Sequence, residues 1–221
     1  MRVLAIDTSS NVATVAVMED ELLLGEYILN HKKTHSQKIM TMIEQILSEL
    51  ELTVQDIDIF AAAIGPGSFT GLRIGVATVK ALAYNVPYAE HIIVPIMDAR
   101  RDNVFTASYI WDEGFKEIGE PEAISIDECL ESCGEFLDTI FVGDGVKVYR
   151  EYIKEKLGDK AIFPPANALN SRASSVAALA LDKAKRGETQ SYLEMKPYYI
   201  RKSQAERELE ERENKEKGES K

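Results

Sequence analysis

Long apolar runs, cysteines and histidines are scarce in this sequence, and each scarcity excludes a class of protein. No apolar run approaches the roughly 18 residues of a membrane-spanning helix, and Asp7 interrupts the N-terminal run where a signal peptide would stay apolar. Cys129 and Cys133 cannot supply the four ligands of a structural zinc site. His31 and His35 have zinc-ligand spacing, but they precede the expected helix and no third ligand follows. We therefore expect a cytoplasmic protein without a bound metal.

Positive charge is also scarce. The 221 residues include 26 Lys and Arg against 37 Asp and Glu, which gives a net charge of −11 at pH 7. Tight nucleic-acid binding by the chain alone is not expected, because the phosphate backbone attracts clustered basic residues. Binding as part of a complex stays open. Residues 206–221 are rich in charge and lack an apolar face, so they are expected to form a disordered tail.

The rest of the chain contains two similar runs of secondary structure. Each run is expected to begin with three antiparallel strands, followed by a helix, a further strand and a second helix. The first run comprises strands 3–7, 13–18, 22–29 and 57–64 with helices 36–51 and 72–85. The second comprises strands 92–97, 103–111, 115–118 and 139–142 with helices 127–136, 148–157 and 171–185. This duplication predicts an α/β fold with two subdomains, 1–91 and 92–205, each a mixed sheet flanked by helices.

The first strand of each half ends at an acidic turn. Asp7 and Thr8 follow the first strand, and Asp98 and Arg100 occupy the same place in the second half. In actin-like ATPases and sugar kinases such a turn holds nucleotide phosphates, with the Asp positioning a metal-bound water and a glycine admitting the phosphate. Neither turn here contains that glycine, and Arg100 adds bulk. A degenerate nucleotide site is therefore favoured, and a small ATPase or kinase that uses Asp7 and Asp98 is the alternative.

A glycine-rich loop links strand 57–64 to helix 72–85. It consists of Gly65, Pro66, Gly67, Ser68, Phe69, Thr70 and Gly71, with Arg73 two residues further on. It is not a Walker loop, since no Lys-Ser/Thr pair follows the last glycine. A sharp turn capped by Ser68 or Thr70 is favoured over an anion site made by backbone amides. Gly143-Asp144-Gly145 is likewise interpreted as an ordinary turn.

Helices 36–51 and 72–85 carry more apolar side chains than packing on one sheet requires. In helix 36–51 these side chains span roughly 160°, against about 100° for a helix on one sheet, and helix 72–85 is apolar nearly all round. Such helices are expected to contact a second polypeptide. The predicted partner or dimer interface consists of Ile39, Met42, Ile43, Ile46, Leu50, Leu72, Val76 and Val79.

Five motifs occur in one order along the chain. They are LAIDTS at 4–9, HSQ at 35–37, GPGSFTGLRIG at 65–75, DARR at 98–101 and PYYIRK at 197–202. Together they closely resemble the TsaB family of bacterial tRNA threonylcarbamoyladenosine biosynthesis proteins, over about residues 1–205. The resemblance implies two actin-like, ribonuclease H-type subdomains.

The resemblance also implies a role. Family members serve as a non-catalytic scaffold for TsaD, the subunit that transfers a threonylcarbamoyl group to the adenosine next to the anticodon of tRNAs reading A-starting codons. The two subunits pair through helices that correspond to 36–51 and 72–85, and the ATPase TsaE joins at their junction. For this chain alone the resemblance implies no catalytic residue, no metal and no cofactor. ATP or ADP would bind at the junction of the complex, and tRNA only through the complex.

Two further expectations accompany this reading. A homodimer through the same helices is expected when TsaD is absent, because an apolar helix face is unfavourable in water. A metalloprotease, suggested only by distant kinship with the glycoprotease group, is the weakest alternative to the scaffold role.

The chain departs from the family pattern at one place. Family members have an edge strand and a further helix between the glycine-motif helix and the strand that ends in Asp-Ala-Arg, whereas here only residues 81–91 separate them. A strand and a helix of ordinary length need about 15 to 20 residues. A stretch of this length is therefore expected to be absent near Lys80 and Ala81.

Overall fold

The computed structural model describes residues 1–10, 12–30, 35–63, 76–86, 91–133 and 138–191. Within these ranges the side chains of 35–37 and 76–79 are not described. The predicted glycine-rich loop and the charged tail lie outside the described residues, as do His31 and Leu72.

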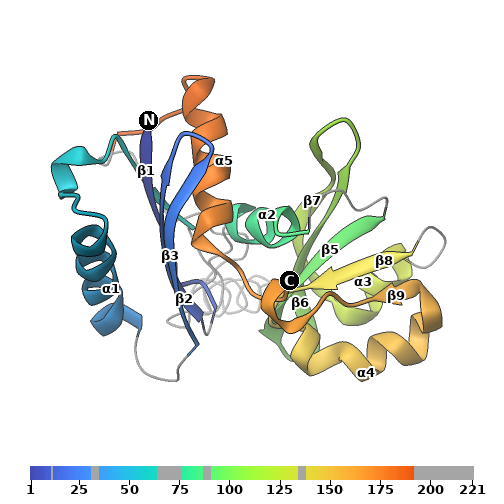
Figure 1. Ribbon diagram of the computed structural model, residues 1–221. Coiled ribbons are helices and arrows are strands. Elements are labelled where there is room, and N and C mark those ends of the chain that lie inside the picture. The colour runs from blue at the N-terminus through green and yellow to red at the C-terminus, as the bar shows by residue number, and fades with distance from the viewer. Residues whose placement is uncertain (11, 31–34, 64–75, 87–90, 134–137, 192–221) are drawn as a thin grey trace, which may run out of the picture.

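Two mixed sheets form the two halves of the fold (Figure 1). The first has the strand order β3-β2-β1-β4, with β1 antiparallel to β2 and parallel to β4. Its strands are β1 (Arg2–Asp7), β2 (Val12–Glu19), β3 (Leu22–Asn30) and β4 (Ile59–Ala62). Helix α1 (His35–Glu49) and a short 3-10 helix (Val54–Asp56) connect β3 to β4, and helix α2 (Val76–Tyr84) follows.

The second sheet has the strand order β7-β6-β5-β8-β9, with β5 antiparallel to β6 and parallel to β8. Its strands are β5 (Ile92–Arg100), β6 (Asn103–Trp111), β7 (Phe115–Ser125), β8 (Thr139–Val142) and β9 (Ala161–Ile162). The helices are α3 (Ile126–Cys133), α4 (Val146–Leu157) and α5 (Ala173–Lys185). Two 3-10 turns, Gly158–Lys160 and Ala166–Ala168, lie between α4 and α5.

The structural duplication predicted from the sequence is confirmed. The orders β3-β2-β1-β4 and β7-β6-β5-β8 match, and so do their parallel and antiparallel pairings. Strand β9, which lies parallel to β8, has no counterpart beside β4 among the described residues. Strand β4 is therefore an edge strand, and the side chain of Phe60 on it is 55% exposed.

The first sheet is covered on both faces because its strands alternate their side chains. Leu4, Val15 and Val17 point to one face and pack against α1. Val3, Ala5 and Ala16 point to the other face and pack against α5. Helix α5 follows the second sheet in the chain but completes the first half in space (Figure 1). The predicted subdomain boundary at residue 91 assigned helix 171–185 to the second half, whereas α5 packs on the sheet of the first half.

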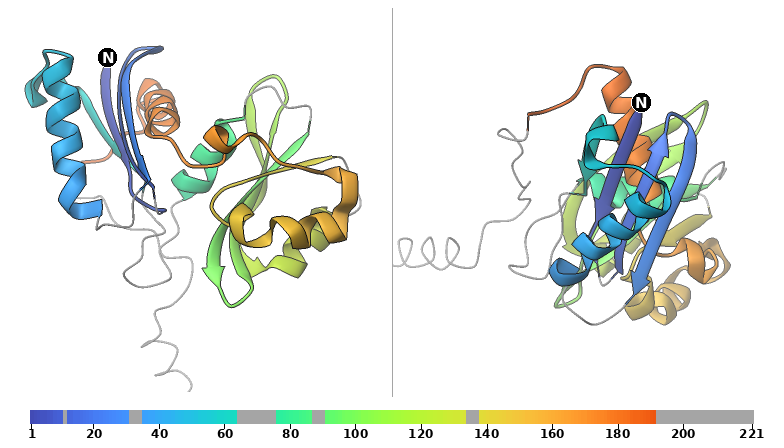
Figure 2. Two further views of the ribbon diagram at one scale, coloured as in Figure 1. Left: turned by 60° about the horizontal axis from the view of Figure 1, so that its bottom comes forward. Right: turned by 60° about the vertical axis from the view of Figure 1, so that its left-hand side comes forward.

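Helix α2 lies between the two halves, on the opposite side of the first sheet from α1 (Figures 1 and 2). Ala81 packs in the cluster formed by α5 and the first sheet, and Leu82 and Ala83 pack against the second sheet. The apolar surface of this part of α2 is therefore covered by the chain itself. The prediction that it needs a second polypeptide is wrong for these residues, because periodicity reports burial but not what buries the side chain.

Two residues of the predicted partner interface belong to the core of the first half. Met42 and Ile46 are 7% and 2% exposed, and both lie on the side of α1 that packs against the first sheet. They are not available to a partner, which corrects their assignment. Ile39, Ile43 and Leu50 are half-buried at the border of the same cluster, while Met40 on α1 is 59% exposed. Val76 and Val79 lie on α2, and their side chains are not among those described.

Candidate functional site

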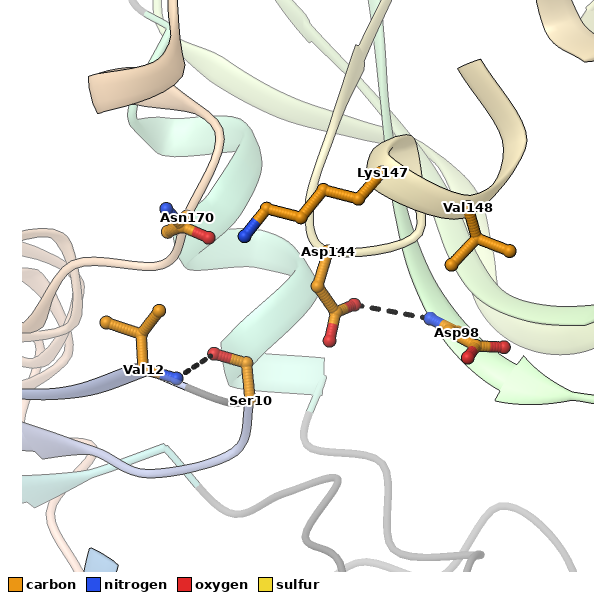
Figure 3. A pocket seen from close by; sticks show the side chains of 7 residues that line it. All are labelled: Ser10, Val12, Asp98, Asp144, Lys147, Val148 and Asn170. Carbon is orange, nitrogen blue, oxygen red and sulfur yellow. Dashed lines mark hydrogen bonds between the residues drawn. The ribbon is translucent and has the colours of Figure 1, made fainter. Parts of the chain in front are cut away.

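A small cavity lies between the two halves, beside the turn from β1 to β2 and the end of β5. It has a volume of about 150 Å³, and Figure 3 shows the side chains that line it. The first half contributes Ser10 and Val12, the second contributes Asp98, Asp144, Lys147 and Val148, and the segment before α5 contributes Asn170. Ligand pockets usually have about 300 to 1,000 Å³, so this cavity is too small for a whole nucleotide.

Asp7, the first predicted nucleotide-site carboxylate, is committed to hydrogen bonds within the protein. It is 1% exposed, and its Oδ1 accepts hydrogen bonds from the backbone amide of Ser9 (2.8 Å) and from its hydroxyl (2.5 Å). The hydroxyl of Ser171 donates to the other oxygen, Oδ2. Each oxygen therefore has a donor within the protein, and Asp7 ties the end of β1 to the segment before α5. Thr8 beside it is half-buried.

Asp98, the second predicted carboxylate, is exposed at the edge of the cavity. Its Oδ1 accepts a hydrogen bond from the amide of Arg100 at 2.8 Å, which folds the turn after β5. Its own amide donates to Oδ1 of Asp144 at 3.3 Å (Figure 3). Asp7 and Asp98 thus have different environments: Asp7 is buried and accepts hydrogen bonds from internal donors, whereas Asp98 is open to solvent.

Asp144 is a cavity residue that the sequence analysis placed only in an ordinary turn. Burial raises the pKa of its carboxyl above the ordinary value of 3.8, and the charge of Asp98 acts in the same direction. The hydrogen bond from the Asp98 amide and the charge of Lys147, in the first turn of α4, partly offset this rise in pKa. Asp144 could have been recognised from the sequence as a candidate site residue. It is flanked by two glycines and lies between a buried strand and a helix.

The two glycines beside Asp144 are required by close backbone packing. Gly143 has φ of 103°, and a Cβ there would lie 2.3 Å from the carbonyl oxygen of Ile96. A Cβ on Gly145 would lie 2.9 Å from the same oxygen, which accepts a hydrogen bond from the Gly145 amide at 3.1 Å. This contact brings the loop between β8 and α4 against β5, and so places Asp144 and Lys147 at the cavity.

Ser171 and Asn170 were not found by sequence reasoning, and no local signal identifies them. They belong to a short segment that joins the halves. Asn170 accepts a hydrogen bond from the Asn85 side chain through its carbonyl oxygen. Arg172, which follows Ser171, forms an ion pair with Glu26 of β3. These contacts link residues more than 80 positions apart in the chain.

In the described part of the chain, no three His, Cys, Asp or Glu side chains are arranged to hold a metal ion. Cys129 and Cys133 are free thiols, both buried in the core around α3. No helix in the same part is long and apolar enough to span a bilayer.

We expect replacement of Asp144 by Asn to stabilise the fold at pH 7. A raised carboxyl pKa means that the folded state holds a proton that the unfolded state has released, so stability falls as pH rises from about 4 through the raised pKa. Asn removes this loss and keeps an oxygen that can accept the Asp98 amide. We expect a gain of up to about 1 kcal/mol at pH 7 and a flatter pH profile between pH 4 and 7, measured by urea unfolding. Asp159→Asn, at an exposed carboxyl in the 3-10 turn after α4, is the control. A lower stability of Asp144→Asn at pH 7 would contradict the expectation.

The duplicated mixed sheets with an acidic turn after the first strand of each define the chain as a protein of the actin-like ATPase fold. A Pseudomonas aeruginosa protein described as similar to peptidase YeaZ has a solved structure with a TM-score of 0.73 and 22% identity, covering 90% of this chain and 99% of that one. The activator of 2-hydroxyisocaproyl-CoA dehydratase from Clostridium difficile, solved with ADPNP, has a TM-score of 0.51 and 10% identity, covering 86% and 99%. At these identities the likeness shows the fold alone.

Sequence comparison gives the family. The model of the family "TsaD: tRNA N6-adenosine threonylcarbamoyltransferase" matches residues 23–89. The tRNA threonylcarbamoyladenosine biosynthesis protein TsaB of Bacillus subtilis (strain 168) is 30% identical over 225 aligned positions, covering 93% of this chain and 96% of the relative. The chain belongs to the TsaB family of tRNA threonylcarbamoyladenosine biosynthesis proteins, as its motifs indicated.

The same alignment bears on the missing stretch. Because 93% of 221 residues is about 206, some 19 of the 225 aligned positions hold no residue of this chain. That total is of the size of one strand and one helix, and the absence of such a stretch near Lys80 and Ala81 stays a prediction.

Proposed function

We propose that the chain is a non-catalytic scaffold subunit of the complex that installs threonylcarbamoyl on the adenosine next to the anticodon of tRNAs reading A-starting codons. In this role it binds a TsaD-like catalytic subunit, and a TsaE-like ATPase joins them. The state of Asp7 carries the proposal. A carboxylate that is 1% exposed and accepts internal hydrogen bonds from Ser9 and Ser171 at its two oxygens is closed to solvent, which disfavours a role in positioning a metal-bound water.

The size of the cavity supports the same reading. At about 150 Å³, the cavity that the described residues form between the halves is smaller than a usual ligand pocket. We therefore propose that the chain binds no cofactor by itself, and that ATP or ADP binds at the junction of the assembled complex. Contact with tRNA would likewise require the complex, since the chain has a net charge of −11.

We place the partner surface on α1 alone. The outer side of α1 leaves apolar area uncovered at Met40, which is 59% exposed, and at the half-buried Ile39 and Ile43. We call these three residues the α1 patch. The described part of α2 is on the other side of the first sheet and cannot extend this patch. In the absence of TsaD the same patch would form a homodimer.

The test is reconstitution together with a hydrolysis assay. We expect the chain to copurify with TsaD-type subunits, and tRNA modification from threonylcarbamoyl-adenylate to require it. The isolated chain should show no multiple-turnover ATP hydrolysis above a buffer blank. Hydrolysis that disappears in Asp98→Asn, an exposed position that should fold normally, and in Asp7→Asn would contradict the scaffold role and favour the ATPase alternative.

A further inference from the structure

The turn between β5 and β6 has an unusual backbone for its sequence. Arg100 pairs with Asn103 across the hairpin, so Arg101 and Asp102 form a two-residue turn. All three residues from Arg100 to Asp102 have positive φ, at 64°, 53° and 57°. Such hairpin turns favour Asn and Gly, because the left-handed region is unfavourable for side chains with a Cβ. Strained residues of this kind cluster at ligand-binding sites.

Hydrogen bonds hold this turn in one conformation. The Arg100 amide donates to Asp98, and the Asn103 side chain donates to the Arg101 carbonyl oxygen at 2.7 Å. The Asp102 carbonyl oxygen accepts from the amide of Ile126, at the start of α3, at 2.9 Å. A register shift between Asp98 and Arg100 marks a bulge in the hairpin, and bulges redirect side chains beside functional sites.

The two arginines in this turn are exposed and available to bind an anion. Among the described residues neither forms an ion pair, although the chain as a whole is strongly acidic. The planar guanidinium group binds phosphate oxygens through two parallel hydrogen bonds. Asp98, two residues before Arg100, lines the cavity between the halves (Figure 3). The arginines therefore come shortly after a cavity residue in the chain and are not themselves among the residues that line the cavity.

We infer that Arg100 and Arg101 form a phosphate-binding turn that contacts the sugar-phosphate backbone of tRNA in the assembled complex. The inference rests on the proposed function and adds a tRNA-contacting site on this chain. The acidic remainder of the chain repels RNA, so the turn adds to affinity supplied by partner subunits and binds weakly by itself. The phosphates of a nucleotide such as ATP could bind the same guanidinium groups, so the experiment distinguishes tRNA from a nucleotide as the source of phosphate.

The experiment compares two variants that remove the same charge. Arg100→Asn with Arg101→Asn removes both guanidinium groups but keeps a residue that tolerates positive φ. Lys116→Asn with Lys160→Asn is the control, because these exposed lysines lie at the end of the second sheet opposite the turn. Equal melting temperatures would establish that both fold. Binding of tRNA is measured against salt for the complex with TsaD- and TsaE-type subunits, and at low salt for the chain alone.

We expect the arginine variant to bind tRNA about tenfold more weakly than the control at physiological salt. Its plot of log affinity against log salt should also be shallower by about 1.5 to 2, as for two lost phosphate contacts. Equal affinity and slope in the two variants would overturn the inference. Weaker binding of ATP with unchanged binding of tRNA would overturn the tRNA assignment and identify a nucleotide as the source of phosphate.

Failure of the proposed function would look different. In that case the wild-type chain would neither assemble with TsaD-type subunits nor support modification. The low-salt comparison on the chain alone would still decide whether the turn binds tRNA.

Discussion

Gly143→Ala is expected to lower the free energy of unfolding by about 3 to 5 kcal/mol, the largest stability effect of any single methyl group added to the described glycines. The new Cβ would lie 2.3 Å from the Ile96 carbonyl oxygen and 3.1 Å from its carbon, both backbone atoms that cannot rotate away. Overpacking costs about 1 to 3 kcal/mol and a residue at unfavourable positive φ a similar amount. Urea unfolding of the full chain measures the sum.

A matched variant separates the clash from the backbone strain. Gly187, just after the end of α5, also has positive φ, 75°, but a Cβ there meets nothing within 4 Å. Gly187→Ala should therefore cost only about 1 kcal/mol. If Gly143→Ala cost no more than Gly187→Ala, the close approach of the β8–α4 loop to β5 would be wrong. The position of Asp144 at the cavity would then need another explanation.

Periodicity and turn chemistry predicted most of this fold because they depend on local sequence. Strands 103–111 and 139–142 match β6 and β8 residue for residue. The duplication followed from the same patterns. Strand β7 runs seven residues past its predicted end at Ile118, to Ser125, because its mixed polar pattern does not show where pairing stops. Strand β9 has only two residues, so its sequence is too short to show the alternation of a strand.

The candidate site was harder to predict because its contacts are long-range. Asp7 was identified from its turn, but the donor that occupies its second oxygen, Ser171, is 164 residues away. The turn sequence alone therefore did not show which residue pairs with Asp7. The end of helix α2 illustrates the same limit, since Ala81, Leu82 and Ala83 are buried as their apolar pattern indicated, but α5 and the two sheets cover them instead of another chain.

Met40→Glu is expected to abolish most of the affinity for a TsaD-like subunit without changing the stability of the isolated chain. Met40 is 59% exposed on α1, so water solvates the new carboxylate in the free protein. In a complex that covers the α1 patch, the same carboxylate would be buried without a counter-charge, at a cost of several kcal/mol. Because each 1.4 kcal/mol is tenfold in affinity, binding should fall at least about a hundredfold.

Gln45→Glu on the same helix is the control for this prediction. Gln45 is also exposed and gains the same charge, but it lies about 140° around the helix from Met40. It should keep partner binding within a factor of about two. Affinity for TsaD, the oligomeric state by sedimentation and the modified-adenosine content of tRNA from cells carrying each variant are the measurements. If Met40→Glu folds, binds TsaD normally and sustains modification, α1 is not the partner surface. A homodimer of the wild-type chain that persists in Met40→Glu would likewise place self-association elsewhere on the molecule.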